Sequence, residues 1–377
     1  MEKLDTLIQN NNDLQKLVQR AKQTDAIALD TEFVWERTYF PQLGLIQIAL
    51  SDEDCYLIDP CAIKDLSPLG QLLADRSIVK IFHDAPQDLV ILHRATGAVP
   101  QNIFDTRLAA GFSNLPATLS LCNLARELLD ITISKTETRT NWMQRPLSSE
   151  QIAYGLNDVR YLRAIRVILL TRIIGPKIKA WLQEELNLLN NPATYSGPPL
   201  DKKFRKIRGS GSLDRLGLAV LKNLTIWRET TARKLNRPRG HIIKDTVLLE
   251  LARQRPRTVD MLREVGILSA NAFKKYGKTI AAVTDETCRQ DPSSFPSVRR
   301  SIRLNTRQKK TYEKLNNLIA LKCELLGIAP PLVGTSAELK QVVKMLSSNG
   351  KMAGNAQLKQ TGGWRKTLLE DFFKQNI

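Results

Sequence analysis

Cysteine and histidine are scarce in this chain of 377 residues. The five cysteines are scattered, odd in number and free of any C-x-x-C pair, and there are three histidines. Secreted domains rely on paired cysteines, and structural zinc sites need clustered Cys and His ligands. The sequence therefore predicts a cytoplasmic protein with reduced thiols and no zinc site.

Long apolar runs are missing as well. The first residues, MEKLDTLIQNNNDLQ, lack the apolar core of a signal peptide, and the most apolar stretch, AIRVILLTRIIG, is interrupted by Arg166 and Arg172. A membrane-spanning helix needs about 20 mostly apolar residues. We expect neither secretion nor membrane insertion. A membrane partner is also disfavoured, because the sequence shows no amphipathic anchor and no lipidation motif.

Acidic residues are sparse in one half of the chain only. Residues 201–377 hold 36 Lys and Arg against 15 Asp and Glu, whereas residues 1–200 hold 20 against 23. The net charge of +18 therefore comes from the second half, which contains the basic stretches KKFRKIR, RPRGH and RRSIR. Arrays of Lys and Arg bind nucleic acid by releasing its counterions. A polyanionic partner is the simplest explanation.

Acids with a regular spacing stand out in the first half. Asp30 and Glu32 follow the apolar run 26–29, where strand geometry sends residues i and i+2 to one face. Tyr154 and Asp158 lie in a segment with apolar residues at helical spacing, where an i,i+4 pair shares a face. With Asp88 they form a set of hard oxygen donors, which favours Mg²⁺ or Mn²⁺ over Zn²⁺.

Each acid also has a purely structural explanation. An Asp such as Asp30 at the end of a strand is more often a turn or cap residue than a ligand. Asp84 and Asp88 both follow His83, so either could belong to the pattern. We expect Asp84 in the turn before a helix, as its cap, and Asp105 as the N-cap of another short helix.

The order and flanks of these residues resemble the ribonuclease D family, part of the DEDD superfamily of 3′–5′ exonucleases. The family motif D-x-E is present as Asp30 to Glu32, H-x4-D as His83 to Asp88, and Y-x3-D as Tyr154 to Asp158. A sister subfamily has a His where this chain has Ala153, so the tyrosine branch fits better. The stretches TYFPQLGLIQIAL and KTETRTNWMQRPL also resemble this family.

The resemblance implies a centre with two divalent cations, Mg²⁺ or Mn²⁺, held by Asp30, Glu32, Asp88 and Asp158. It implies that Asp30 bridges both ions, that Glu32 and Asp158 complete one site, and that Asp88 holds the other through water. Cations of this kind generate a nucleophile and stabilise the leaving 3′ oxygen. Tyr154 is a poor base at neutral pH, because a tyrosine pKa is about 10, so we expect it to orient water.

Three further residues are candidates for binding the substrate. Phe33 follows the first motif and could stack on the terminal base, although a core position is equally compatible with the sequence. Lys135 and Arg139, four residues apart, could bind phosphates of the trimmed strand. The alternative for this pair is a solvated charged face.

Two stretches rich in Pro, Gly, Ser and basic residues, near 190–212 and 291–305, predict linkers. They divide the chain into an α/β exonuclease domain of the ribonuclease H-like type and two all-α domains. The exonuclease domain would span residues 1–192, with strands near 26–33, 43–50, 54–58 and 78–82. Residues 213–290 resemble an HRDC domain, and residues 307–377 resemble a second, degenerate HRDC-type domain.

Together these features predict a metal-dependent 3′–5′ exoribonuclease. By resemblance it would trim structured RNA precursors with a single-stranded 3′ end, transfer RNA precursors above all, and release 5′-monophosphates as a monomer. One rival is a DNA exonuclease of the proofreading type, which uses the same five residues. A rival from another class is a nucleic-acid-binding protein with a dead active site, which the intact set of five residues disfavours.

Overall fold

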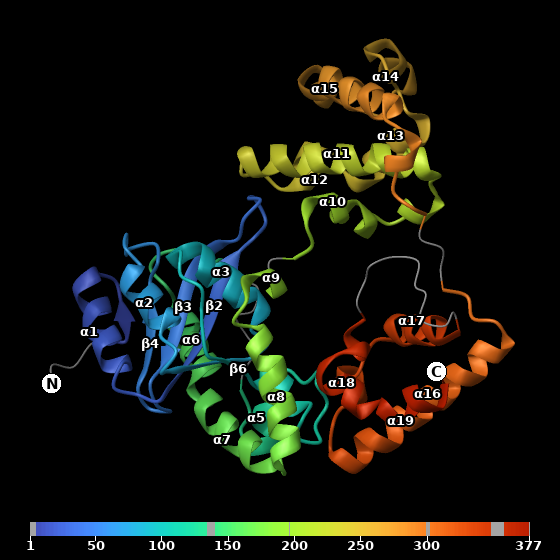
Figure 1. Ribbon diagram of the computed structural model, residues 1–377. Coiled ribbons are helices and arrows are strands. Elements are labelled where there is room, and N and C mark those ends of the chain that lie inside the picture. Colours follow the sequence, from blue (N-terminus) through green and yellow to red (C-terminus); the bar gives the residue numbers. More distant parts are fainter. Residues whose placement is uncertain (1–4, 134–139, 196, 299–301, 348–357, 377) are drawn as a thin grey trace. The chain divides into compact units, whose positions relative to one another are not determined.

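The computed structural model describes residues 5–133, 140–195, 197–298, 302–347 and 358–376 (Figure 1). The chain forms two compact units. Unit 1 contains Met1–Phe33, Leu43–Ser196 and Ile302–Ile377, and unit 2 contains Val34–Gln42 and Gly197–Ser301. Unit 1 is therefore assembled from three separate stretches of the sequence.

A six-stranded mixed sheet lies at the centre of unit 1, in the order β1-β4-β3-β2-β5-β6. The strands are β1 (Leu7–Ile8), β2 (Ala26–Val34), β3 (Gln42–Ala49), β4 (Cys55–Ile58), β5 (Val79–Phe82) and β6 (Ile103–Asp105). Neighbours β2, β5 and β6 run parallel, whereas β3 and β4 are antiparallel. The four predicted strands are confirmed. The short β1 and β6 were not predicted.

Helices cover both faces of this sheet (Figure 1). In unit 1 they are α1 (Asn11–Ala21), α2 (Ser67–Ala74), α3 (Pro86–Thr96), α4 (Thr106–Ala110), α5 (Leu121–Leu129), α6 (Ser149–Arg160), α7 (Leu162–Arg172), α8 (Pro176–Leu188), α9 (Pro192–Tyr195), α16 (Thr306–Leu326), α17 (Ser336–Ser347), α18 (Gly363–Leu368) and α19 (Glu370–Asn376), with single 3-10 turns η4 (Pro330–Leu332) and η5 (Lys359–Thr361). One apolar core joins the sheet to α1, α2 and α3. A second core joins its other face to α4–α8 and to α16–α19.

The segment 302–377 differs from the expectation of a separate helical domain, because it lies inside unit 1. Trp364 is 1% exposed and stacks on Trp181 of α8 with ring centroids 5.3 Å apart. The Arg365 guanidinium donates to the Glu185 carboxylate of the same helix. Burial of large aromatic rings contributes strongly to a core. Helices α16–α19 therefore complete the core of the exonuclease fold.

Unit 2 is helical, as predicted. It contains α10 (Leu200–Lys203), α11 (Arg215–Lys234), α12 (Arg239–Ile242), α13 (Asp245–Gln254), α14 (Val259–Val265) and α15 (Ala270–Arg289), with 3-10 turns η1 (Phe204–Lys206), η2 (Ser210–Ser212) and η3 (Pro292–Ser294). The predicted linker near 190–212 is more ordered than expected. It forms α9, α10, η1 and η2, and Phe204 and Ile207 are buried in the core of unit 2.

The connection between β2 and β3 also belongs to unit 2. The Tyr39 hydroxyl donates to the carboxylate of Glu229, a residue that is 1% exposed, at 2.7 Å. Lys203 donates to the same carboxylate oxygen at 2.7 Å. A buried carboxylate needs such partners, because an unpaired charge in the interior is costly. Within the described ranges, no helix is long and apolar enough to span a bilayer.

Candidate active site

Strand β2 carries the first two acids on one face of the sheet. Ala26 and Ala28 pack into the core that contains Val159 of α6, whereas Ile27 and Leu29 pack into the core that contains α3. Because successive side chains alternate, Asp30 and Glu32 share the face of Ala26 and Ala28. The observed strand is the one from which their shared face was predicted. The first motif is therefore directed toward α6.

Helix α6 brings the third motif to the same place. Its start is fixed by a capping box, in which Ser148 accepts from the Gln151 backbone N–H and the Gln151 side chain accepts from the Ser148 N–H. Gly155 allows the helix to lie close to the sheet, since an added Cβ would come within 3.2 Å of Leu45 and Leu57. The neighbouring Tyr154 hydroxyl is bonded to the Asp158 carboxylate on the next turn.

Trp142 supports Tyr154 from behind. It is 2% exposed, and its ring centroid lies 5.9 Å from that of Tyr154. Such an aromatic pair restricts the rotation of the phenol ring. The tryptophan is part of the family-like stretch KTETRTNWMQRPL, but nothing in its own sequence context assigned it a place at the site.

Asp88 comes from the opposite face of the sheet, on the first turn of α3. Its side chain is 7% exposed, and its Oδ1 accepts a 2.5 Å hydrogen bond from the Thr31 hydroxyl of β2. Asp84, the other candidate, is largely exposed and forms an ion pair with Arg107. Of the two acids, Asp88 is the one that is buried against β2.

Asp105 fixes the turn that leads into α3. Its carboxylate accepts from the backbone N–H groups of Asp84 and Ala85 in this turn, and from those of Arg107 and Leu108 at the start of α4. It is therefore the N-cap of α4, as predicted. It also connects the turn before α3 to the start of α4 by hydrogen bonds. Asp84 lies in the turn but does not cap α3. Its φ is +65°, and α3 begins after Ala85 without a side-chain cap.

The environment of the four acids disfavours their ionisation. Burial, followed by the charges of the three neighbouring acids, raises the pKa of Asp30 well above its usual value. Burial together with the charges of Asp158 and Asp88 raises the pKa of Glu32 to about 8. Burial raises the pKa of both Asp88 and Asp158 to about 7. The protein alone therefore does not compensate the negative charge of these side chains.

Burial and the three acids nearest to it also raise the pKa of Tyr154. The phenol consequently stays protonated at neutral pH and can hold a water by hydrogen bond, but cannot take a proton from it. The role of Tyr154 in orienting a water stays a prediction.

A cluster of carboxylates of this kind fits a divalent cation. All four side chains offer oxygen donors, and a cation would lower the mutual repulsion that raises their pKa values. Within the described part of the chain, no three acidic, His or Cys side chains already form a ligand set for one ion. The fit therefore rests on donor type and on electrostatics, not on preformed coordination geometry.

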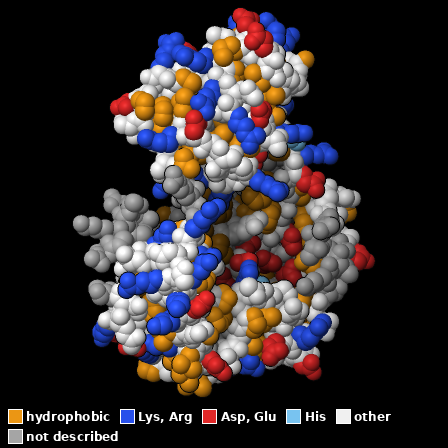
Figure 2. Space-filling model, turned by 90° about the vertical axis from the view of Figure 1, so that its right-hand side faces the viewer, with side chains coloured by type: hydrophobic (Ala, Val, Ile, Leu, Met, Phe, Trp, Pro, Cys, Tyr) orange, Lys and Arg blue, Asp and Glu red, His pale blue; other side chains and the backbone are white. Residues whose placement is uncertain are grey.

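Two of the four acids, Asp30 and Asp88, line a cavity of about 360 Å³ together with Thr31, Phe33, Asp84, Pro86 and Gln87. Phe33 is half-buried and lines this cavity, so it is within the site. In Figure 2, several acidic side chains lie close together in the recessed central part of the view. Lys135 and Arg139, the other predicted substrate contacts, lie outside the described residues.

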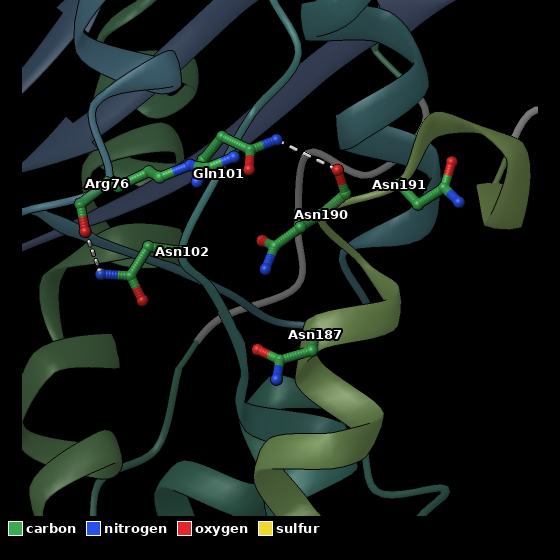
Figure 3. A pocket seen from close by; sticks show the side chains of 6 residues that line it. All are labelled: Arg76, Gln101, Asn102, Asn187, Asn190 and Asn191. Carbon is green, nitrogen blue, oxygen red and sulfur yellow. Dashed lines mark hydrogen bonds between the residues drawn. The ribbon is translucent and has the colours of Figure 1, made fainter.

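A second cavity of about 440 Å³ is lined by Arg76, Gln101, Asn102, Asn187, Asn190 and Asn191 (Figure 3). Two of its carboxamide side chains form hydrogen bonds to backbone carbonyls of neighbouring segments. The Gln101 side chain donates to the Asn190 carbonyl, and that of Asn102 donates to the Arg76 carbonyl. Because Arg76 and Asn102 precede β5 and β6, this cavity lies at the opposite end of these strands from Asp84 and Asp105.

Known protein families and sequences resemble this chain over most of its length. A family model described as 3′–5′ exonuclease matches residues 6–174, and a model described as HRDC domain matches residues 217–284. A ribonuclease D of Desulfotalea psychrophila is 53% identical over 99% of this chain and 98% of its own length. A ribonuclease D of Bartonella henselae is 32% identical over 96% of this chain and 87% of its own length.

Solved structures also resemble the structure of this chain. The crystal structure of Escherichia coli RNase D, described as an exoribonuclease involved in structured RNA processing, matches with a TM-score of 0.84 at 28% identity. That match covers 100% of this chain and 98% of the other. The catalytic core of RRP6 from Trypanosoma brucei matches with a TM-score of 0.58 at 18% identity, over 76% of this chain and 84% of the other, which shows a shared fold.

Proposed function

The chain belongs to the ribonuclease D family and is a 3′–5′ exoribonuclease, and from this we propose that it trims structured RNA precursors, chiefly those of transfer RNA. The substrate proposal is supported by the E. coli relative, which processes structured RNA. It is also supported by charge, since residues 197–301 of unit 2 hold 23 Lys and Arg against 10 Asp and Glu. Basic surfaces of this kind hold phosphates without reading sequence.

Exonucleases of this family depend on divalent metal ions. We propose that Asp30, Glu32, Asp88 and Asp158 hold two of them, of the Mg²⁺ or Mn²⁺ type. When bound, such ions lower the pKa of water and neutralise charge on the leaving 3′ oxygen. The observation that carries this proposal is the raised pKa of all four carboxylates in one buried cluster.

We propose roles for the other candidate residues as well. Tyr154, protonated and bonded to Asp158, orients the attacking water. Phe33, at the wall of the cavity, stacks on the terminal base of the RNA. Lys135 and Arg139 are proposed to hold its phosphates. Cleavage then releases one nucleoside 5′-monophosphate at a time.

The test compares RNA and DNA oligomers of the same sequence, labelled at the 3′ end, with Mg²⁺ or Mn²⁺. We expect labelled 5′-monophosphates from RNA, dependence on the metal, and slower release from DNA. The Asp30→Asn variant, which removes one charge without changing shape, is the matched control and should be inactive. Equal rates on DNA would favour the proofreading type of exonuclease. More than a tenth of wild-type activity in the variant would contradict the proposed metal site.

A further inference from the structure

Thr31 lies between the two acids of the first motif, and no role follows for it from the motif. Its side chain points to the opposite face of the sheet, because residues alternate along β2. It is 5% exposed there, beside the first turn of α3. Strand β2 thus presents Asp30 and Glu32 to one face and a hydroxyl to the other.

That hydroxyl is aimed at Asp88. Thr31 Oγ1 lies 2.5 Å from Asp88 Oδ1, within hydrogen-bonding distance, and the hydroxyl donates to this carboxyl oxygen. Both residues are buried, with exposed fractions of 5% and 7%, so water does not compete readily for this bond. The contact joins residues 57 positions apart in the sequence, on different secondary-structure elements.

We propose that Thr31 is a positioning residue, whose hydroxyl holds the Asp88 carboxylate in the orientation needed for a divalent cation. The inference rests on the proposed metal centre. Asp88 is the acid that reaches the site from α3, whereas Asp30 and Glu32 are fixed to the same strand and Asp158 is held by Tyr154. A hydroxyl on β2 therefore links the strand that carries Asp30 and Glu32 to the acid on α3.

The β-branched shape of Thr31 suits this task. Threonine has few side-chain rotamers, so a strand backbone fixes the direction of its hydroxyl. Partners that orient a metal ligand in this way change metal affinity about 10–100-fold when they are removed. We therefore expect a change in cation binding that can be measured without RNA and without turnover.

The experiment titrates the full chain with Mn²⁺ alone and follows free Mn²⁺ by electron paramagnetic resonance. Thr31→Val keeps the shape of the side chain and removes the hydroxyl, and should weaken Mn²⁺ binding about 10–100-fold. Thr31→Ser keeps the hydroxyl and should bind Mn²⁺ like the wild type. The matched control is Thr284→Val, which removes a buried hydroxyl bonded to the Ile280 carbonyl in unit 2 and should change nothing.

Unchanged Mn²⁺ affinity in Thr31→Val would overturn the proposal. So would an equal loss in Thr31→Ser and Thr31→Val, because packing of the methyl group would then explain both. If Thr31→Val fails to fold, as seen by circular dichroism, Thr31→Ala takes its place, because it also removes the hydroxyl and should weaken Mn²⁺ binding about 10–100-fold relative to Thr31→Ser. A wild-type chain that binds no Mn²⁺ would instead refute the proposed metal centre itself, and with it the role of Thr31.

Discussion

Asp84 and Asp88 are four residues apart in the sequence, yet the structure gives them different surroundings. Asp88 is buried and bonded to Thr31, whereas the Asp84 side chain is 58% exposed and paired with Arg107. An exposed ion pair contributes little to stability, roughly 0–1 kcal/mol. The chemistry of the site should therefore depend on one of these acids and hardly on the other.

We expect Asp88→Asn to abolish hydrolysis of RNA and Asp84→Asn to lower it less than tenfold. Asparagine also tolerates the left-handed conformation of residue 84, so the second variant should fold normally. Single-turnover rates at saturating Mg²⁺ provide the measurement. The reverse order of effects would mean that Asp84 is the ligand of the second motif.

Tyr154 gives a second prediction. If its phenol only orients water, Tyr154→Phe should lower the rate about 10²–10³-fold, the loss typical of one preorganised hydrogen-bonding group. Mn²⁺ affinity should stay near that of the wild type, because the phenol is not a proposed ligand. Trp142→Phe, which keeps an aromatic ring behind Tyr154, is the control and should be milder. A collapse of Mn²⁺ binding in Tyr154→Phe would make this tyrosine part of the metal site.

The raised pKa values of the acids predict how stability changes with pH. The unfolded acids titrate near pH 4, whereas burial raises the pKa of Asp88 and Asp158 to about 7 and that of Glu32 to about 8. Between these values the native state holds protons that the unfolded chain has released. The free energy of unfolding of the metal-free protein should therefore fall as pH rises from about 5 to about 8.

Urea denaturation at several pH values measures this effect. Asp30→Asn removes one repelling charge and should show a shallower fall, and saturating Mg²⁺ should abolish the fall in the wild type. Burial lowers the pKa of His83, so this residue makes the free energy of unfolding rise with pH near its usual pKa. Because His83 is present in both the wild type and Asp30→Asn, it does not affect the comparison between them. Metal-free stability that rises over this range would contradict the clustering of ionisable acids.

For single residues, the sequence indicated which side chains share one face of a strand or helix. It did not indicate which residues from other elements they contact. The spacings of Asp30 with Glu32 and of Tyr154 with Asp158 predicted which side chains share a face. The contacts of Thr31 and Trp142 could not be predicted, because each joins segments that are distant in sequence. The spacing of apolar and polar residues describes a single helix or strand and not the contacts between elements.

Among the secondary-structure elements, the junction of β5 with α3 depends on one carboxylate. Asp105 accepts four backbone N–H groups, two in the turn before α3 and two at the start of α4. Without it, α3 would lack a fixed start, and Asp88 lies on the first turn of that helix. A single side chain therefore stabilises two helices and the approach of one metal ligand.

Asp105→Ala should lower the free energy of unfolding by about 2 kcal/mol or more, since a lost N-cap costs about 0.5–2 kcal/mol and buried donors without partners add to it. Chemical denaturation measures the loss. Ser269→Ala, which removes the exposed N-cap of α15 in unit 2, is the matched control and should cost about 1 kcal/mol or less. Equal effects of the two substitutions would show that Asp105 acts as an ordinary cap.

Elements with strong patterns were predicted well, and short ones were not. Apolar runs predicted the four longer strands. Strand β6 was missed because it has three residues and ends in Asp105, which the sequence indicated only as a helix N-cap. The linker near 190–212 looked exposed by composition. Its helical turns form because Phe204 and Ile207 find an apolar core in unit 2, which composition does not reveal.

On the scale of the whole molecule, charge is divided unevenly between the units. Residues 197–301 have a net charge of +13, out of +18 for the chain. Lys202, Lys206 and Arg208 are exposed members of the KKFRKIR stretch in unit 2. These residues are available for phosphates and are distant in sequence from the catalytic acids.

Replacing these three residues with Gln should weaken binding of a transfer RNA precursor and flatten its salt dependence. Each lost phosphate contact lowers the slope of log K against log salt by about 0.7–0.9. Binding titrations at several salt concentrations give the slope, and hydrolysis of a short single-stranded oligomer serves as the control that should stay unchanged. A slope equal to that of the wild type would show that this stretch does not contact RNA.

The organisation of the chain was predicted only in part. Helical periodicity indicated that residues 307–377 are helical but did not reveal what the apolar faces of these helices cover. Trp364 and Phe373 pack into the same core as Trp181 and the helices that follow the third motif. A chain that ended near residue 190 would therefore expose this core, and would not be an independent catalytic domain.

The divided construction of unit 1 has a consequence for biosynthesis. A ribosome makes every proposed catalytic residue within the first 158 positions, yet Trp364 and its neighbours in the same core are added only after all of unit 2. During translation the nascent chain thus carries the acids of a nuclease without the completed interior that holds them in place. We expect an enzyme that destroys RNA to remain inactive on the messenger that encodes it until residues 302–377 have been made.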